Sequence, residues 1–135
     1  PLEIMQLARK AKRNGKPVLD DPIVRNQLVE FITEIQAFRL NQSRQRVQPL
    51  VQDRPMALPL MNKLLHTEYT RRVNEFAISL LGTKGGYYTD EPNAVDNGYW
   101  HRGYLNAFSA TIGGGTSQIQ HNIIGEHVLG LPKTR

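Results

Sequence analysis

The amino-acid sequence predicts an all-α protein, an antiparallel up-and-down helical bundle that forms one domain over residues 1–135. Long segments repeat their apolar residues at spacings of three and four, which places those residues on one stripe of a helix. No segment of the sequence sustains the two-residue alternation of a half-buried strand. The length of 135 residues and the apolar fraction of 39% are enough for one hydrophobic core.

The first expected helix covers Leu2 to Arg13, and the turn-forming pair Asn14-Gly15 ends it. The second helix runs from Pro22 to about Val47, where Asp21 can cap the free amides that precede the first turn. Its apolar stripe consists of Val24, Leu28, Phe31, Ile35 and Phe38. Prolines then stop this helix and predict an extended connection that ends at Pro59.

The third helix is expected from about Leu60 to Leu81, with Gly82 after its end. Residues 82–98 are rich in Gly, Pro, Asn and Asp, which predicts a long surface loop. A shorter helix then covers about Tyr99 to Thr111, and we expect Leu105 and Phe108 to turn inward. The last helix covers about Thr116 to Leu129, because Gly130 and Pro132 end it.

The net charge of +5 is concentrated near the N-terminus. Five basic residues follow one another with no acid between them: Arg9, Lys10, Lys12, Arg13 and Lys16. Nucleic-acid binding is disfavoured, because this segment contains no aromatic residue for stacking on bases. The favoured interpretation is a solvated helix end, and attraction for an anionic partner or ligand stays open.

Several classes of protein are excluded by composition. The chain has no cysteine, which excludes a disulfide framework and a thiolate site and predicts a reducing, cytoplasmic setting. No apolar run reaches the roughly 18–20 residues of a membrane span.

We predict no metal site, because His121 and His127 would point to different faces of one helix. Trp100 is expected to anchor packed helices.

The run from Thr111 to Gln120 is the segment of the sequence that predicts a ligand-binding site. Three glycines, Gly113, Gly114 and Gly115, directly precede the first turn of the last helix. Glycines allow a close approach of backbone to ligand, and the free amides of a helix start favour an anion such as phosphate. Ser117 and Gln120 also fit the spacing of a capping box. The alternative, a flexible linker followed by an ordinary cap, stays open.

Continuous with this run, Asn122-Ile123-Ile124-Gly125-Glu126 and Val128-Leu129-Gly130-Leu131-Pro132 complete a specific pattern. From Ile112 to Pro132 the sequence closely resembles the C-terminal helix of flavin-dependent acyl-CoA dehydrogenases. The resemblance extends less sharply to Asp20-Asp21-Pro22 and Lys63-Leu64-Leu65. It implies the family's C-terminal four-helix bundle, here without the two upstream domains and without the first bundle helix.

The resemblance also implies site residues. Thr116, Ser117 and Gln118 match positions that contact FAD, and Gly115 matches the position beside the acyl-CoA thioester. Many members carry the catalytic glutamate where this chain has Gly114, so no catalytic residue can be named. The loop that contacts FAD of a neighbouring subunit in many members is matched too weakly at Gly85-Gly86. The long loop, Trp100 and the triple glycine look more like members that handle bulky acyl groups such as sterol side chains.

Two functions follow from the resemblance. In the first, the chain is part of an enzyme that oxidises an acyl-CoA to a trans-2-enoyl-CoA with hydride transfer to FAD, and it passes electrons to a separate acceptor. The bundle would supply FAD contacts and the interface of a homo- or hetero-oligomer, a dimer or a tetramer. In the second, it is a non-catalytic partner subunit, or interaction module, of a heteromeric complex. Gly114 favours the second and the Thr116-Ser117-Gln118 turn favours the first.

Overall fold

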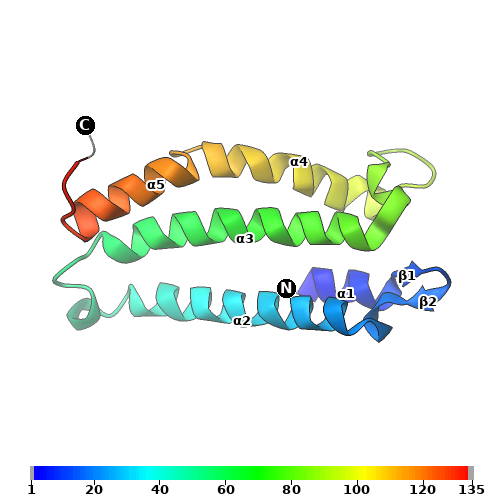
Figure 1. The fold of residues 1–135 in the computed structure, drawn as a ribbon, viewed down its shortest axis with the longest axis horizontal. Helices are drawn as coiled ribbons and strands as arrows, with labels where there is room; N and C mark the ends of the chain where they lie inside the picture. Colours follow the sequence, from blue (N-terminus) through cyan, green and yellow to red (C-terminus); the bar gives the residue numbers. More distant parts are fainter. Residues whose placement is uncertain (1, 134–135) are drawn as a thin grey trace.

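The computed structural model describes residues 2–133, and the predicted all-α antiparallel bundle is confirmed. The long helices lie side by side and alternate in direction, with the end-to-end pair α4 and α5 on the opposite side of α3 from α2 (Figure 1). The α-helices are α1 (Leu2–Lys10), α2 (Pro22–Arg44), α3 (Ala57–Leu81), α4 (Tyr99–Ile112) and α5 (Ser117–Ile123).

The segment after α1 differs from its prediction. The helix ends at Lys10, and β1 (Lys12–Arg13) pairs antiparallel with β2 (Lys16–Pro17). Asn14 and Gly15 connect them with φ angles of 52° and 77°, which are typical of the type I′ turn that joins two strands of a hairpin. The expected helix to Arg13 was therefore wrong over its last residues, although its turn was located correctly.

The ends of α2 and α3 follow local chemistry. Asp21 caps α2 as predicted, because its Oδ1 accepts a hydrogen bond of 2.8 Å from the amide of Ile23. The helix ends at Arg44, three residues before the expected Val47. A short 3-10 turn (Gln48–Leu50) follows, and α3 begins at Ala57. Pro59 was expected to precede α3, but it lies in the first helical turn, where a missing amide costs no hydrogen bond.

The region before α4 is more ordered than the predicted loop. Two 3-10 helices occupy its ends, Gly82–Gly86 and Val95–Gly98. The amide of Asp90 donates to Oδ1 of Asn97 over 2.8 Å, which ties the middle of the loop to its end. Gly98 then begins α4 in a left-handed conformation with φ of 70°.

The hydrophobic core lies where α1, the start of α2, the end of α3 and the start of α4 meet. Its buried members are Ile4, Leu7, Ala8, Val18, Val24, Leu28, Ala77, Leu80 and Trp100. Trp100 is 4% exposed and belongs to this core, which joins residues of several helices, so its predicted packing role is confirmed. The inward orientation expected for Leu105 and Phe108 was wrong, because α4 instead buries Trp100 and Ala107.

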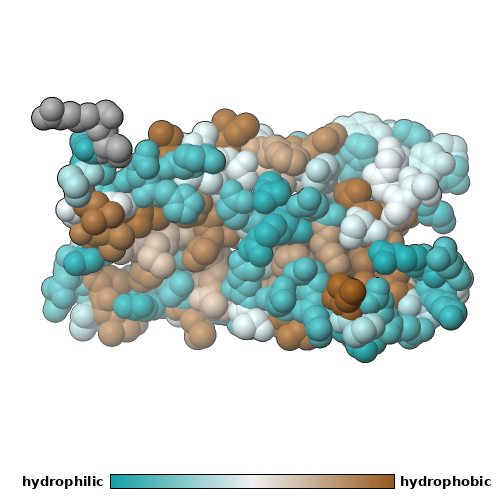
Figure 2. Space-filling model, viewed as in Figure 1, coloured by the Kyte–Doolittle hydropathy of each residue, from teal (hydrophilic) through white to brown (hydrophobic). Residues whose placement is uncertain are grey.

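Burial decreases toward the other end of α2. Phe31 is buried, whereas Ile35 and Phe38 of the same stripe are only half-buried. The short helix α1 contacts α3 and the 3-10 turn Val18–Asp20 at the end of the bundle where the core lies, and hydrophobic side chains show at the surface of the other end (Figures 1 and 2). The bundle therefore has a compact end and an open, apolar end.

Candidate functional site

The triple glycine forms a turn between α4 and α5 that depends on glycine at two positions. Gly114 and Gly115 have φ angles of 68° and 95°, a region that side-chain-bearing residues rarely adopt. A Cβ on Gly115 would lie 3.0 Å from Nε2 of Gln120 and 3.3 Å from Cγ2 of Ile119. The flexible-linker interpretation is therefore not supported, because this turn has a defined conformation with neighbours packed against it.

Thr116 begins α5. Its Oγ1 accepts a hydrogen bond of 3.3 Å from the amide of Ile119, which is the contact of an N-cap residue. Ser117 is the first helical residue, so the expected capping box with Ser117 as the cap was wrong. Gln120 instead donates from Nε2 to the carbonyl oxygen of Gly114 over 2.7 Å, and its side chain is buried.

Two side chains of α3 contact the same turn. Nζ of Lys63 donates a hydrogen bond of 2.5 Å to the carbonyl oxygen of Gly115. The hydroxyl of Ser117 donates to Oε1 of Glu68 in a short hydrogen bond. Both ends of the Gly115–Ser117 segment are thus bonded to the neighbouring helix.

Charged groups of α3 surround Glu68. Nε of Arg71 lies 3.3 Å from its Oε2, and Arg71 also pairs with Glu75 over 3.1 Å. The Ser117 hydrogen bond, with added contributions from Arg71 and Arg72, lowers the pKa of Glu68 against the opposing effect of desolvation. Glu68 is therefore ionised at neutral pH and accepts hydrogen bonds as a carboxylate.

The predicted site residues lie together at an accessible surface. Gly114 and Gln118 are exposed, whereas Gly115, Thr116 and Ser117 are half-buried. Gly114, the position that the resemblance matches to a catalytic glutamate, has no side chain, and the carboxylate bonded to the turn is that of Glu68. A carboxylate with a lowered pKa and two hydrogen-bond donors is a weak proton acceptor.

Sequence reasoning missed the contacts of Lys63 and Glu68 with the turn, and it assigned the wrong contact to Gln120. Lys63 and Glu68 lie 52 and 49 positions before their partners in the turn, and no local pattern signals such a pairing. For Gln120 the spacing did give a signal, but the capping-box interpretation assigned its side chain to the wrong backbone group.

The basic residues lie at the other end of the bundle from the start of α5 (Figure 1). The hairpin residues from Lys12 to Lys16 are exposed, and Arg13 forms a long ion pair of 3.9 Å with Asp21. These charges are exposed as predicted: Arg9 and Lys10 lie at the end of α1, whereas the hairpin residues lie beyond the helix.

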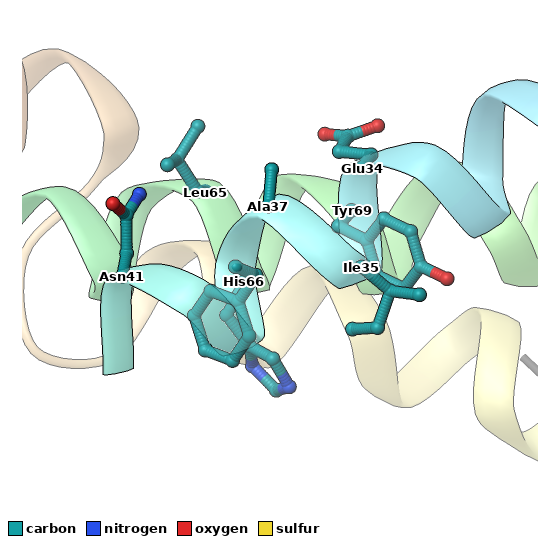
Figure 3. Close-up of a pocket in the computed structure, with 8 residues that line it drawn as sticks. Glu34, Ile35, Ala37, Asn41, Leu65, His66 and Tyr69 are labelled. Carbon is teal, nitrogen blue, oxygen red and sulfur yellow. The ribbon is translucent and has the colours of Figure 1, made fainter. Parts of the chain in front are cut away.

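An apolar pocket opens between α2 and α3 at the open end of the bundle (Figure 3). Its walls include Ile35, Phe38 and Leu65, and the ring of Phe38 lies 5.3 Å from that of His66 between centroids. The hydroxyl of Tyr69 is buried with no hydrogen-bond partner in the described residues, and burial raises the pKa of Tyr69. This pocket shares no lining residue with the glycine turn.

Within residues 2–133, none of the helices has the length and apolar character required to cross a membrane.

Residues 2–129 match the family model described as acyl-CoA dehydrogenase, C-terminal domain. The chain is 37% identical over 132 residues to acyl-CoA dehydrogenase IpdE1 of Mycolicibacterium smegmatis, covering 97% of this chain and 31% of that protein. It is 33% identical over 131 residues to the IpdE1 of Mycobacterium tuberculosis, covering 97% and 32% of the two chains. It therefore spans about a third of the length of these relatives.

Solved structures share the fold. The ChsE4–ChsE5 complex from Mycobacterium tuberculosis matches with a TM-score of 0.78 and 24% identity, over 99% of this chain and 34% of that one. The Tcur3481–Tcur3483 steroid ACAD matches with a TM-score of 0.79 and 24% identity, over 98% and 33%. Together with the match over residues 2–129, these likenesses show that the chain belongs to the acyl-CoA dehydrogenase family and has the fold of its C-terminal helical domain.

Proposed function

We propose that this chain is the C-terminal part of a flavin-dependent acyl-CoA dehydrogenase that oxidises an acyl-CoA to a trans-2-enoyl-CoA. The observation that carries the proposal is the ordered turn from Gly113 to Gln118, which combines two glycine-dependent conformations with an N-capped helix start. When bound, FAD would accept the β-hydrogen of the substrate as a hydride and pass its electrons to a separate acceptor.

The groups exposed at this turn suit a polar cofactor. Gln118 is exposed and its amide can donate and accept, and the half-buried Thr116 has a hydroxyl that can donate. The place of a Cβ on Gly115 is occupied by Gln120 and Ile119, so our assignment of Gly115 to the thioester side of the site is supported by the resemblance alone. Each of these contacts contributes modestly within a large binding surface.

Because position 114 is a glycine, we propose that the proton acceptor for the α-proton comes from outside residues 1–135. A base elsewhere in a longer subunit would give a complete enzyme, and a base on a partner would give a heteromeric one. The second candidate, a non-catalytic partner subunit, is favoured by Gly114 and by the two-protein composition of the solved relatives ChsE4–ChsE5 and Tcur3481–Tcur3483. The description of one as a steroid ACAD supports a bulky, steroid-derived acyl group as substrate.

We further propose that residues 1–135 form one domain of a longer subunit, since the chain spans about a third of its relatives. The half of α2 and α3 that α1 does not cover carries an apolar pocket, as expected where a further bundle helix or a subunit packs. A cytoplasmic location stays a prediction.

The experiment is the visible absorption spectrum of the protein expressed from its complete reading frame, alone and together with candidate partners. A flavin absorption band that bleaches when a steroid-derived acyl-CoA is added is the expected result. A flavin band that appears only with a partner would select the heteromeric candidate. Absence of flavin in every preparation would contradict both the cofactor and the reaction.

The site assignment is tested by replacing Thr116 and Gln118 with alanine in the same protein. We expect this double variant to retain less flavin after gel filtration, because two polar contacts are lost. The matched control is Gln36→Ala, since Gln36 is exposed on α2 away from the turn. Unchanged flavin content in the double variant would remove the assignment.

A further inference from the structure

We propose that Lys63 and Glu68 are positioning residues that hold the Gly115–Ser117 turn in its binding conformation before any cofactor is present. We call these two side chains of α3 the α3 clamp. The identity of the ligand, FAD, rests on the proposed function, whereas the geometry of the turn does not depend on it. It assigns a role to two residues that are not part of the turn.

The first half of the α3 clamp is the bond from Nζ of Lys63 to the carbonyl oxygen of Gly115. Gly115 has φ of 95°, a conformation that glycine populates but does not select by itself. A charge-assisted hydrogen bond of 2.5 Å from a neighbouring helix restricts that carbonyl to one direction. The aliphatic stem of Lys63 also lies under the turn, with Cε 3.8 Å from the place of a Cβ on Gly114.

The second half is the bond from the Ser117 hydroxyl to Glu68. Glu68 is itself fixed by Arg71 at 3.3 Å, so the acceptor is held in position before Ser117 approaches. With both bonds made, the carbonyl of residue 115 and the side chain of residue 117 are anchored to a single rigid element, α3. The backbone between them, including Thr116, is thereby fixed at both ends.

These hydrogen bonds give different roles to Thr116, Ser117 and Gln118, the three positions matched to FAD contacts. The hydroxyl hydrogen of Ser117 is given to Glu68, so toward a ligand Ser117 offers its backbone amide and an oxygen lone pair. Oγ1 of Thr116 accepts from the amide of Ile119, which leaves its hydroxyl hydrogen for a ligand. We infer that Thr116 and Gln118 donate to the cofactor, whereas the side chain of Ser117 orients the turn.

The test measures amide hydrogen exchange of the 113–119 segment in the complete protein with its flavin removed. We expect Lys63→Met and Glu68→Ala each to raise exchange in this segment by roughly tenfold, because each removes a hydrogen bond to a charged group. Lys63→Arg and Glu68→Gln keep a donor and an acceptor, and we expect both to restore most of the protection. Lys84→Met is the matched control, since Lys84 is exposed and follows the C-terminal end of α3, whereas the turn contacts the first half of α3.

A second measurement tests the bond between Ser117 and Glu68 without Glu68→Ala, and the conservative Lys63→Arg tests the other bond if Lys63→Met fails to fold. Ser117→Ala removes the same bond from the other side, and we expect it to raise exchange as much as Glu68→Ala does. The double variant Ser117→Ala with Glu68→Ala should then exchange no faster than either single variant. Additive effects of Ser117→Ala and Glu68→Ala would overturn the α3 clamp. The same conclusion would follow if the clamp variants exchanged the 113–119 segment no faster than Lys84→Met does.

Flavin binding separates this inference from the proposed function. We expect Lys63→Met to weaken FAD binding by roughly tenfold and Lys63→Arg to restore it, through the order of the turn. If no form of the protein binds flavin, the proposed function fails, and the exchange measurement still decides the α3 clamp. If flavin binds and the exchange does not respond, the α3 clamp fails and the proposed function stands.

Discussion

Gly98 is a residue whose replacement should be costly for reasons visible in its immediate surroundings. Its φ of 70° is strained for any residue with a Cβ, and that Cβ would lie 2.8 Å from the amide nitrogen of Thr89. We expect Gly98→Ala to lower the free energy of unfolding by roughly 2–4 kcal/mol, since strain and overlap with backbone add. Urea denaturation of the complete protein measures this value.

Gly86 provides the matched control for this prediction. It has an ordinary φ, and a Cβ there meets nothing within 4 Å. Gly86→Ala should therefore be neutral or slightly stabilising, because alanine has less freedom to lose on folding. A similar loss of stability in both variants would mean that neither φ nor the contact with Thr89 decides the effect.

Glu68 makes the stability depend on pH in a defined direction. Its pKa is lowered in the folded protein, first by the Ser117 hydrogen bond, so the folded state favours the carboxylate. This contribution is present above the unfolded pKa and is lost as pH falls through the lower, folded pKa. We expect the stability difference between wild type and Glu68→Ala to be constant near neutrality and to shrink in acid below about pH 4.5. Thermal unfolding across that range checks it, and a difference that grows in acid would contradict it.

At the scale of helices, α3 and α4 approach closely at Gly103. A Cβ on Gly103 would overlap Oδ1 of Asn74, whose Nδ2 donates to the carbonyl oxygen of Thr70 over 2.8 Å. We expect Gly103→Ala to destabilise the bundle by about 1–3 kcal/mol, because α4 must move away or Asn74 must give up its bond.

A double variant identifies the cause of that loss. Asn74→Ala removes the obstructing side chain, so Gly103→Ala should cost much less in that background. Denaturation of the four proteins gives the coupling between the two sites. Equal costs in both backgrounds would show that a contact other than Asn74 is responsible.

Helices were predictable from the sequence where one face is buried along a regular stripe. The stripe of Val24, Leu28 and Phe31 and the cap at Asp21 located the start and the buried face of α2 correctly, because both signals are local. In α4 the pattern failed, since large residues such as Leu105 and Phe108 lie on the exposed side. The face toward α3 instead uses small residues, Gly103 and Ala107, and small residues do not stand out in a hydrophobic pattern.

The candidate site was predictable only in part, for a related physical reason. Successive glycines before a polar helix start are a local signal, and they located the turn from Gly113 to Gln118. Lys63 and Glu68 reach that turn from another helix, so their contacts depend on how α3 and α5 pack. Asn14-Gly15 was recognised as a turn, but two-residue strands are too short to show alternation.

At the scale of the whole molecule, flavin should couple to stability. A ligand that binds only the folded protein stabilises it by about 2.7 kcal/mol at one hundred times its dissociation constant. We therefore expect removal of flavin from the complete protein to lower its melting temperature, and readdition to restore it. The restoration should be smaller in the variant with Thr116 and Gln118 replaced by alanine. Melting temperatures that do not respond to flavin in the wild type would contradict the cofactor.

The order of helices in space, in which each long helix packs on the next one in the chain, also bears on how the bundle assembles. A contact between two helices that follow one another in the chain closes only a short loop. Topologies built from such contacts fold faster than those in which segments far apart in the sequence must pair. The bonds from α3 to the Gly115–Ser117 turn span about fifty residues, which adds only a modest entropic penalty for closure. During synthesis from the N-terminus, all residues of α3 are therefore made before the glycine turn, so the helix can already be formed when the turn leaves the ribosome.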